Sequence, residues 1–180
     1  TCALPILYMY RKGEKSHPNK IALFWTIGAS IVSFVGAGLL GFAHTLPQTN
    51  LYTHGTLVTA MHGHYAFWGA YAMIVLAIIS YALPNLTGRK RYNNTSGHMA
   101  FWLSNVGMLG MTVAFGVAGV AQVYLERKMK LDFMDVQNEI AIHFVVLLLC
   151  ATLFTTGITL FIIEFIKYGK PTDEALVKEE

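Results

Sequence analysis

The sequence has few charged residues, and they are confined to short segments. Asp, Glu, Lys and Arg make up 13% of the 180 residues, whereas hydrophobic residues make up 54%. This composition excludes an ordinary soluble domain, in which about 25% of residues are charged. A membrane-spanning helix needs about 20 consecutive apolar residues, and four stretches of this chain are that long. The sequence therefore predicts an all-α integral membrane protein with a single membrane domain over residues 1–180.

Four transmembrane helices are expected at residues 21–43, 55–83, 98–125 and 139–168, followed by a polar tail at 169–180. The second of these helices is expected to stop at Pro84, and residues 44–54 and 125–138 read as polar loops. Small residues on the helices favour close packing in lipid, so they need neighbouring helices as partners. Examples are Gly36, Gly41, Gly107 and Gly110.

Cysteine is scarce, and a secretory signal is missing. Cys2 and Cys150 make no disulfide framework, and Cys150 lies in an apolar run where it packs as a small hydrophobic residue. Thr1 is no initiator Met, and basic residues follow the first apolar residues instead of preceding them. Residues 1–10 are apolar but too few to span a membrane, so they look like the last turns of a preceding helix. We therefore expect the C-terminal portion of a longer membrane protein.

Lys and Arg are missing from the loop at 44–54 and unevenly distributed elsewhere. Four spans place the first loop, the third loop and the tail on one side, and that side carries ten of the 13 Lys and Arg residues. Cytoplasmic loops of membrane proteins are enriched in Lys and Arg. The tail is therefore expected in the cytoplasm, and the helix at 55–83 is expected to begin on the outer side.

That helix contains no charged residue, and its only groups that titrate near neutral pH are His62 and His64. Imidazole is costly at membrane depth, so an ionisable residue there is by default a functional site. Positions two apart on a helix project about 200° from one another, onto opposite faces. The two rings cannot coordinate the same metal ion, but each can reach a different cofactor. At 1.5 Å per residue they lie about 10–14 Å below Gly55, in the outer half of the membrane.

Haem suits this pattern better than zinc, because no Cys or carboxylate converges on these positions. A haem packs edge-on between membrane helices, and its iron takes axial histidine. Gly63 lets flat groups come close to the helix. A haem with a second histidine from another helix would transfer electrons, whereas a haem without one would keep an open face for substrate.

The stretch from Gly36 to Pro84 resembles the haem–copper oxidase superfamily, and within it the large subunits of cytochrome c-dependent nitric oxide reductases. It reads GAGLLGFAHTLPQTNLYTHGTLVTAMHGHYAFWGAYAMIVLAIISYALP. Weaker similarity runs through the Gly- and Met-rich third helix and the stretch DVQNEIAIHF. The resemblance covers nearly the whole chain and implies the last four helices of a twelve-helix bundle.

By this resemblance, His62 is the proximal axial ligand of a high-spin, catalytic haem b, and His64 is one axial ligand of a low-spin haem b. The family's non-haem iron takes three His and a Glu from earlier helices, and the second low-spin ligand also lies outside this sequence. The remaining histidines are not expected to replace these ligands, since they stand in loops, at helix ends or alone. They are His17, His44, His54, His98 and His143.

The implied reaction is that of denitrification: two nitric oxide molecules, two electrons and two protons give nitrous oxide and water. A membrane-anchored cytochrome c subunit would supply electrons on the periplasmic side of a bacterial inner membrane. The other expected partners are the lipid bilayer and the missing N-terminal helices. No nucleic acid is expected to bind. Tyr65, Thr56, Thr59 and His54 are candidates near the haems, with His54 or Thr56 beside the propionates, and Glu164 reads as a snorkelling residue.

Two alternatives stay open at this point. An oxygen-reducing relative would share the helix with histidines two apart, and its second metal lies outside this sequence. A four-helix cytochrome b anchor that only relays electrons would bracket each haem with histidines from its own bundle. His143 is the only spare intramembrane candidate for that second arrangement.

Overall fold

The computed structural model describes residues 19–88 and 94–168, and every regular element within them is helical. The elements are α2 (Lys20–Ser33), η1 (Phe34–Leu40), α3 (Gly41–Thr45), α4 (Pro47–Thr53), α5 (Leu57–Phe67), η2 (Trp68–Ala72), α6 (Met73–Thr87), α7 (Asn94–Val123), η3 (Tyr124–Lys128), α8 (Phe133–Glu139) and α9 (Ala141–Tyr168), where η marks a π-helix. The helix end expected within residues 1–10 and the tail at 169–180 lie outside the described residues.

Four of the described segments are long and apolar enough to span a membrane. They are Lys20–Thr45, Leu57–Leu86, Thr95–Lys128 and Ala141–Lys167, with mean hydropathy between 1.7 and 2.4. The expected all-α membrane architecture with four transmembrane helices is thereby confirmed. The chain is a multi-pass membrane protein.

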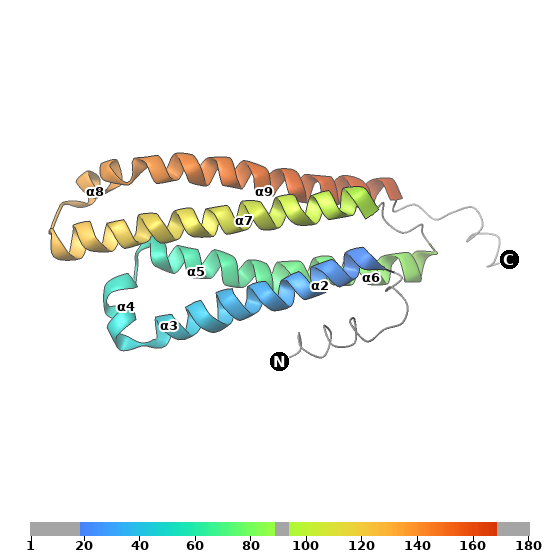
Figure 1. Ribbon diagram of the computed structural model, residues 1–180, viewed down its shortest axis with the longest axis horizontal. Helices are drawn as coiled ribbons and strands as arrows, with labels where there is room; N and C mark the ends of the chain where they lie inside the picture. Colours follow the sequence, from blue (N-terminus) through green and yellow to red (C-terminus); the bar gives the residue numbers. More distant parts are fainter. Residues whose placement is uncertain (1–18, 89–93, 169–180) are drawn as a thin grey trace.

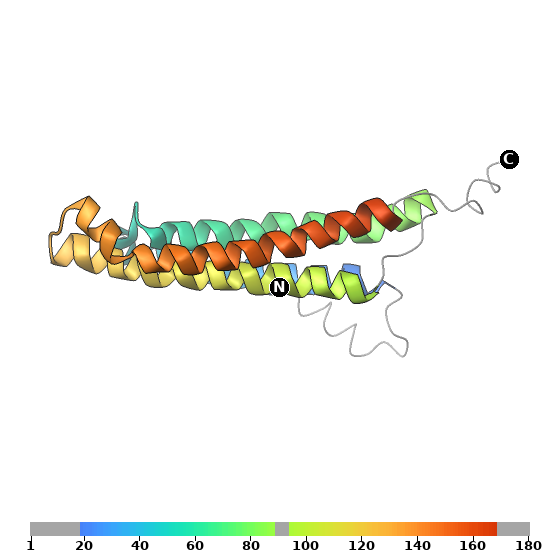
Figure 2. The same cartoon turned by 90° about the horizontal axis from the view of Figure 1, so that it is seen from above.

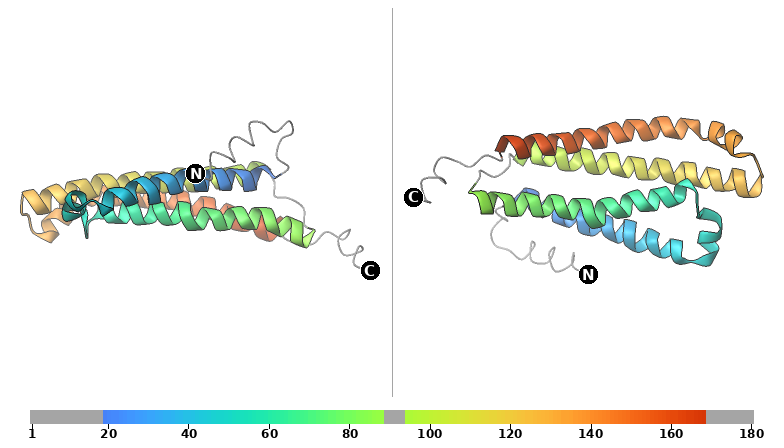
Figure 3. Two further views of the ribbon diagram at one scale, coloured as in Figure 1. Left: turned by 90° about the horizontal axis from the view of Figure 1, so that it is seen from below. Right: turned by 180° about the vertical axis from the view of Figure 1, so that it is seen from behind.

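The four spans lie side by side as antiparallel rods (Figure 1). Within this bundle α9 packs along α7, α7 packs against α5, and α6 packs against α2. The short helices α4 and α8 lie together at one end, and Figure 2 and Figure 3 show this from above, below and behind. We call it the α4 end. α5 begins there, so the first turns of α5 lie close to that end of the bundle.

A cluster of aromatic rings joins the four spans. Trp25 of α2 is fully buried, and its ring lies edge-on to Trp68 of η2, Phe101 of α7 and Phe161 of α9. The ring centroids are 6.1, 5.0 and 5.8 Å from that of Trp25. Edge-to-face pairs at such distances are favourable, and helices in lipid associate through packing of this kind. We call these four residues the aromatic core.

Glycines bring neighbouring helices into backbone contact, as the small-residue faces predict. A Cβ added at Gly36 would lie 2.7 Å from the backbone nitrogen of Ala66, and one at Gly107 would lie 2.7 Å from the Cα of Phe154. Real Cβ atoms do not approach other atoms so closely. Close packing of η1 on α5, and of α7 on α9, therefore requires glycine at these two positions.

Several helix boundaries differ from the sequence expectation. The second span runs through Pro84 to Thr87, because a single proline is tolerated within a membrane helix, and it ends at Gly88 in the left-handed region with φ +60°. The span begins at Leu57, not at residue 55, because the hydroxyl of Thr56 caps it by accepting from the backbone N–H of Val58.

Both expected polar loops contain short helices. Pro47 occupies the first turn of α4, where its missing N–H costs no hydrogen bond. α8 is anchored by Val136 and by Ile140 just beyond its end, both almost completely buried. Glu164 does not snorkel: its side chain is only 8% exposed, since it lies one turn after Phe161 on the packed face of α9.

Candidate functional site

His62 lies in the second turn of α5, with its ring directed toward η1 and α3. Its Nδ1–H donates to the carbonyl oxygen of Gly36 over 2.9 Å. The ring stacks on that of His44, with centroids 4.9 Å apart and planes 23° apart. Gly41 faces the ring edge, because a Cβ there would lie 3.3 Å from Cε1 of His62. The ring is thus fixed by a hydrogen bond on one side and by stacking on another.

His64 faces a different neighbour. Its Nδ1–H donates to the carbonyl oxygen of Ala60 over 2.8 Å, within α5 itself. Its ring lies against Phe115 of α7, with centroids 4.9 Å apart. The side chain is otherwise exposed at the surface of the described bundle. The two histidines of α5 therefore present their rings to separate sides, one toward η1 and the other toward α7.

The hydrogen bonds also fix which ring nitrogen is free. A carbonyl oxygen can only accept, so the Nδ1 of each ring carries the hydrogen. In a neutral imidazole the lone pair then resides on Nε2, which is the atom that can bind a metal. This applies to His62 and His64, and also to His44, whose Nδ1–H donates to the Leu40 carbonyl over 2.8 Å.

His44 is the residue that sequence reasoning passed over. It ends the first span within α3, and its Nε2 is buried without a hydrogen-bond partner among the described residues. A buried acceptor without a partner is unusual, and this one lies beside the His62 ring. The sequence holds no local signal for this contact, because the two rings meet only after the first two spans pack side by side.

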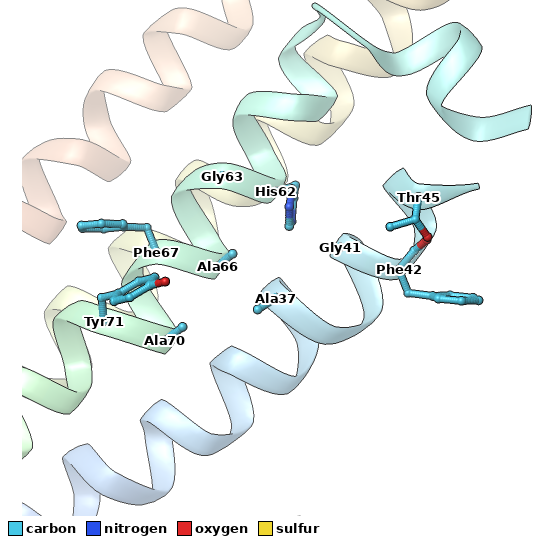
Figure 4. A pocket seen from close by; sticks show the side chains of 10 residues that line it. All are labelled: Ala37, Gly41, Phe42, Thr45, His62, Gly63, Ala66, Phe67, Ala70 and Tyr71. Atoms are coloured by element: carbon cyan, nitrogen blue, oxygen red, sulfur yellow. The ribbon is translucent and has the colours of Figure 1, made fainter. Parts of the chain in front are cut away.

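A cavity of about 620 Å³ opens beside His62, between the first two spans (Figure 4). Its walls come mostly from glycine, alanine and aromatic residues. They are Ala37, Gly41, Phe42, Thr45, His62, Gly63, Ala66, Phe67, Ala70 and Tyr71. Figure 4 shows the His62 ring between the two helices, with the aromatic side chains at the margins. The small residues leave an apolar slot whose only titratable side chains are His62 and Tyr71.

The other candidate residues have local structural roles. The hydroxyls of Thr56 and Thr59 both donate to the carbonyl of Thr53 and so hold the start of α5. The backbone carbonyl of His54 accepts from Arg127 over 3.5 Å, and the His54 side chain is exposed. His143 donates to the carbonyl of Ile140 at the start of α9. Within residues 19–88 and 94–168, no three His, Cys, Asp or Glu side chains converge on a metal-sized site.

Two comparisons with known proteins bear on this arrangement. Residues 4–162 match the family described as Cytochrome C and Quinol oxidase polypeptide I. The chain is also 38% identical over 172 residues to a nitric oxide reductase subunit from Stutzerimonas stutzeri. That similarity covers 91% of this chain but 36% of the relative, so the chain spans about a third of the relative's length. His44, His62 and His64 all lie within the residues that match the family.

Proposed function

The chain belongs to the haem–copper oxidase family, and from that membership we propose that it is the haem-bearing part of a membrane nitric oxide reductase. The similarity to a nitric oxide reductase subunit over 91% of the chain supports the choice within the family. The observation that carries the proposal is the separation of the two rings on α5. His62 points toward Gly36 and His64 toward Phe115, so one helix can serve two cofactors.

The cavity beside His62 has the properties of a haem site. Its volume of about 620 Å³ falls within the usual range for cofactor pockets, and its walls are mostly apolar. The free Nε2 of His62 would hold the iron of a haem bound in this cavity. The hydrogen bond from Nδ1 to Gly36 fixes the tautomer and the orientation of the ring, as outer partners of metal-bound histidines do. His44, with its unpartnered Nε2, lies at the edge of the same site.

The His64 side forms half of a second site. Its ring is oriented by Ala60 and supported by Phe115, and its Nε2 is free. A haem held by His64 for electron relay would need a further protein ligand. We assign that ligand, and the ligands of a non-haem iron, to the remainder of the same subunit.

The assembled site would carry out reductive coupling of nitric oxide. When bound, the two haems supply electron relay and an open iron coordination position for nitric oxide. The hydrogen bond from His62 to the Gly36 carbonyl holds one ligand nitrogen in place beside the cavity. Positioning two small reactants side by side turns an encounter between molecules into an oriented step. Two nitric oxide molecules, two electrons and two protons then give nitrous oxide and water.

A cytochrome c subunit anchored in the membrane would donate the electrons. Both histidines lie within the first three turns of α5, close to the α4 end of the bundle. The Lys and Arg distribution supports our placing that end on the periplasmic side of a bacterial inner membrane. A donor on the periplasmic side would lie closer to His62 and His64 than a donor on the cytoplasmic side.

The proposal is tested on the full subunit purified from membranes with its partner chain. We expect two haems b and one non-haem iron per subunit, and nitrous oxide released from nitric oxide when reduced cytochrome c is supplied. Haem content, total metal analysis and gas analysis measure these quantities. A preparation with one haem, or with two haems and no nitric oxide turnover, would contradict the proposal.

Oxygen reduction is the second candidate, because the matching family is described by its cytochrome c and quinol oxidases. The same metal analysis separates the two. Copper in place of the non-haem iron, together with oxygen uptake, would identify an oxidase.

A further inference from the structure

A buried glutamine links the start of α5 to α7 near the α4 end. The side chain of Gln122 is only 6% exposed. Its Oε1 accepts from the backbone N–H of Leu57 over 2.9 Å, across 65 residues of sequence. Its Nε2 donates to a carboxylate oxygen of Glu126 over 2.8 Å, one turn further along the same rod. The two bonds occupy both ends of the amide.

The chemistry of the two partners fixes the orientation of the amide. The backbone N–H of Leu57 can only donate, and an ionised carboxylate can only accept. The oxygen of Gln122 must therefore face α5, and its nitrogen must face Glu126. Leu57 is the first residue of α5, where a helix leaves its N–H groups without partners inside the helix. Gln122 thus supplies from α7 an acceptor that the α5 backbone lacks.

The same stripe of α7 holds the following turns of α5. Gly119 lies one turn before Gln122, and a Cβ there would lie 2.7 Å from Cγ2 of Val58. Gly116 lies one turn earlier again, and a Cβ there would lie 2.7 Å from the sulfur of Met61. These contacts allow α5 little freedom to turn about its axis or to slide along α7.

His64 lies on this interface, whereas His62 does not. The Leu57–Gln122 and His64–Phe115 contacts are seven residues apart on both α5 and α7. Because the two helices are antiparallel, both contacts lie along the same face of the pair. His62 is held instead by Gly36 and by His44, on η1 and α3. A small shift of α5 on α7 therefore changes the contact of His64 with Phe115 directly, whereas the His62 ring is also held by Gly36 and His44 on other elements.

We infer that Gln122 is a positioning residue that sets the rotation of α5 on α7 and thereby orients His64 toward its haem. This rests on the proposed function, since it takes His64 as an axial ligand of the low-spin haem. Glu126 contributes to this positioning, because its carboxylate accepts from the Gln122 amide and keeps the amide oxygen directed toward α5. The residue acts through the α5 backbone and touches no cofactor.

The test uses the full subunit with its partner chain and reads the low-spin haem by electron paramagnetic resonance. Gln122→Leu removes both hydrogen bonds at nearly constant volume, so we expect shifted low-spin g values and partial loss of low-spin haem. The high-spin signal of the His62 site stays unchanged. Gln122→Glu alone places two carboxylates in contact and gives the same low-spin shift.

The double variant Gln122→Glu/Glu126→Gln exchanges donor and acceptor. Its carboxylate accepts from both Leu57 and the new amide, so we expect the original g values to return. Asn19→Leu is the control, because the Asn19 Nδ2 donates to the Ser80 carbonyl over 2.8 Å and so links the first two spans 16 residues beyond His64. It lowers stability without changing the g values.

The outcomes separate this inference from the function on which it rests. Unaltered protein that shows no low-spin haem overturns the proposed function. Unaltered protein with low-spin haem, whose g values Gln122→Leu leaves unchanged, overturns the inference alone. So does equal disturbance of both haems, or a double variant that fails to restore the signal.

Discussion

The aromatic core and the histidine region, which we define as His44, His62, His64 and the residues that contact their rings, are built by opposite means. In the aromatic core, Trp25 is fully buried against rings from three other parts of the chain. In the histidine region, each ring is held by a hydrogen bond to a carbonyl, and an open cavity lies beside His62. Dense packing holds the helices together at one level, and this permits loose packing where a cofactor must enter.

Both regions include π-helical segments. The histidine region lies against η1, a π-helical segment of seven residues that carries the carbonyl of Gly36. Single π-helical turns inside α-helices are rare and occur frequently at functional sites. Regular helices suffice for the α7–α9 contact, where glycines allow close approach. Trp68 of the aromatic core also lies in a π-helical segment, η2, so this winding occurs in both regions.

The largest effect is expected from breaking the aromatic core. Trp25→Ala removes a fully buried ring that joins four spans, and we expect a loss of about 3–5 kcal/mol in the free energy of unfolding. Unfolding in denaturing detergent, followed by circular dichroism, measures it. Trp102→Ala is the control, because Trp102 is 55% exposed. Equal losses in the free energy of unfolding for both variants would contradict the claim that Trp25 joins the four spans.

A smaller loss, directed at the histidine region, is expected from Gly36→Ala. Its Cβ would meet the backbone of Ala66 and force η1 away from α5, at a cost of about 1–3 kcal/mol. The Gly36 carbonyl would move from His62, so the high-spin haem is lost before the low-spin one. Gly38→Ala is the control, since the nearest atom there is 3.8 Å from the added Cβ. Optical spectra of the two variants should differ; identical spectra would contradict this account of η1.

His44 allows the stacking and the free nitrogen to be separated. His44→Phe keeps a ring against His62 but removes the unpartnered Nε2. We expect haem affinity at the His62 site to fall about tenfold, as for other outer partners of metal ligands, with the low-spin haem unaffected. Haem titration of the apoprotein measures this. Unchanged affinity would mean that the Nε2 of His44 contacts no part of the cofactor.

The smallest effect is expected on the outer face of α9. Thr152 is exposed, and its hydroxyl donates to the carbonyl of Leu148 in the same helix. Thr152→Val should change the free energy of unfolding by no more than about 0.5 kcal/mol and leave both haem spectra intact. Detergent unfolding provides the measurement. A large change would indicate that this face carries a contact in the full subunit.

The sequence predicts those features that depend on neighbouring residues alone. Uncharged stretches predict the spans, and the spacing of His62 and His64 predicts rings on different faces, which is the arrangement of their neighbours here. The helix boundaries were less accessible. Pro84 was a misleading stop signal, because a membrane helix tolerates proline and the chain ends the helix at Gly88 instead.

The contacts that complete the region depend on the pairing of distant segments. The loop predicted at 44–54 begins with His44, but in the structure this residue lies within α3 and stacks on His62, 18 residues away on another helix. Gln122 looks like an ordinary polar residue until α5 is placed on α7. Glu164 carries a charge that predicts exposure, but the helical phase it shares with Phe161 turns it inward.

The central claim is that His62 and His64 serve two different haems, and single alanine variants of the full subunit test it most directly. Electron paramagnetic resonance and optical spectra resolve high-spin from low-spin haem in each variant. We predict that His64→Ala loses the low-spin signal and keeps high-spin haem, and that His62→Ala does the reverse. Loss of the same signal in both variants would show that the two rings belong to one site and would contradict the account.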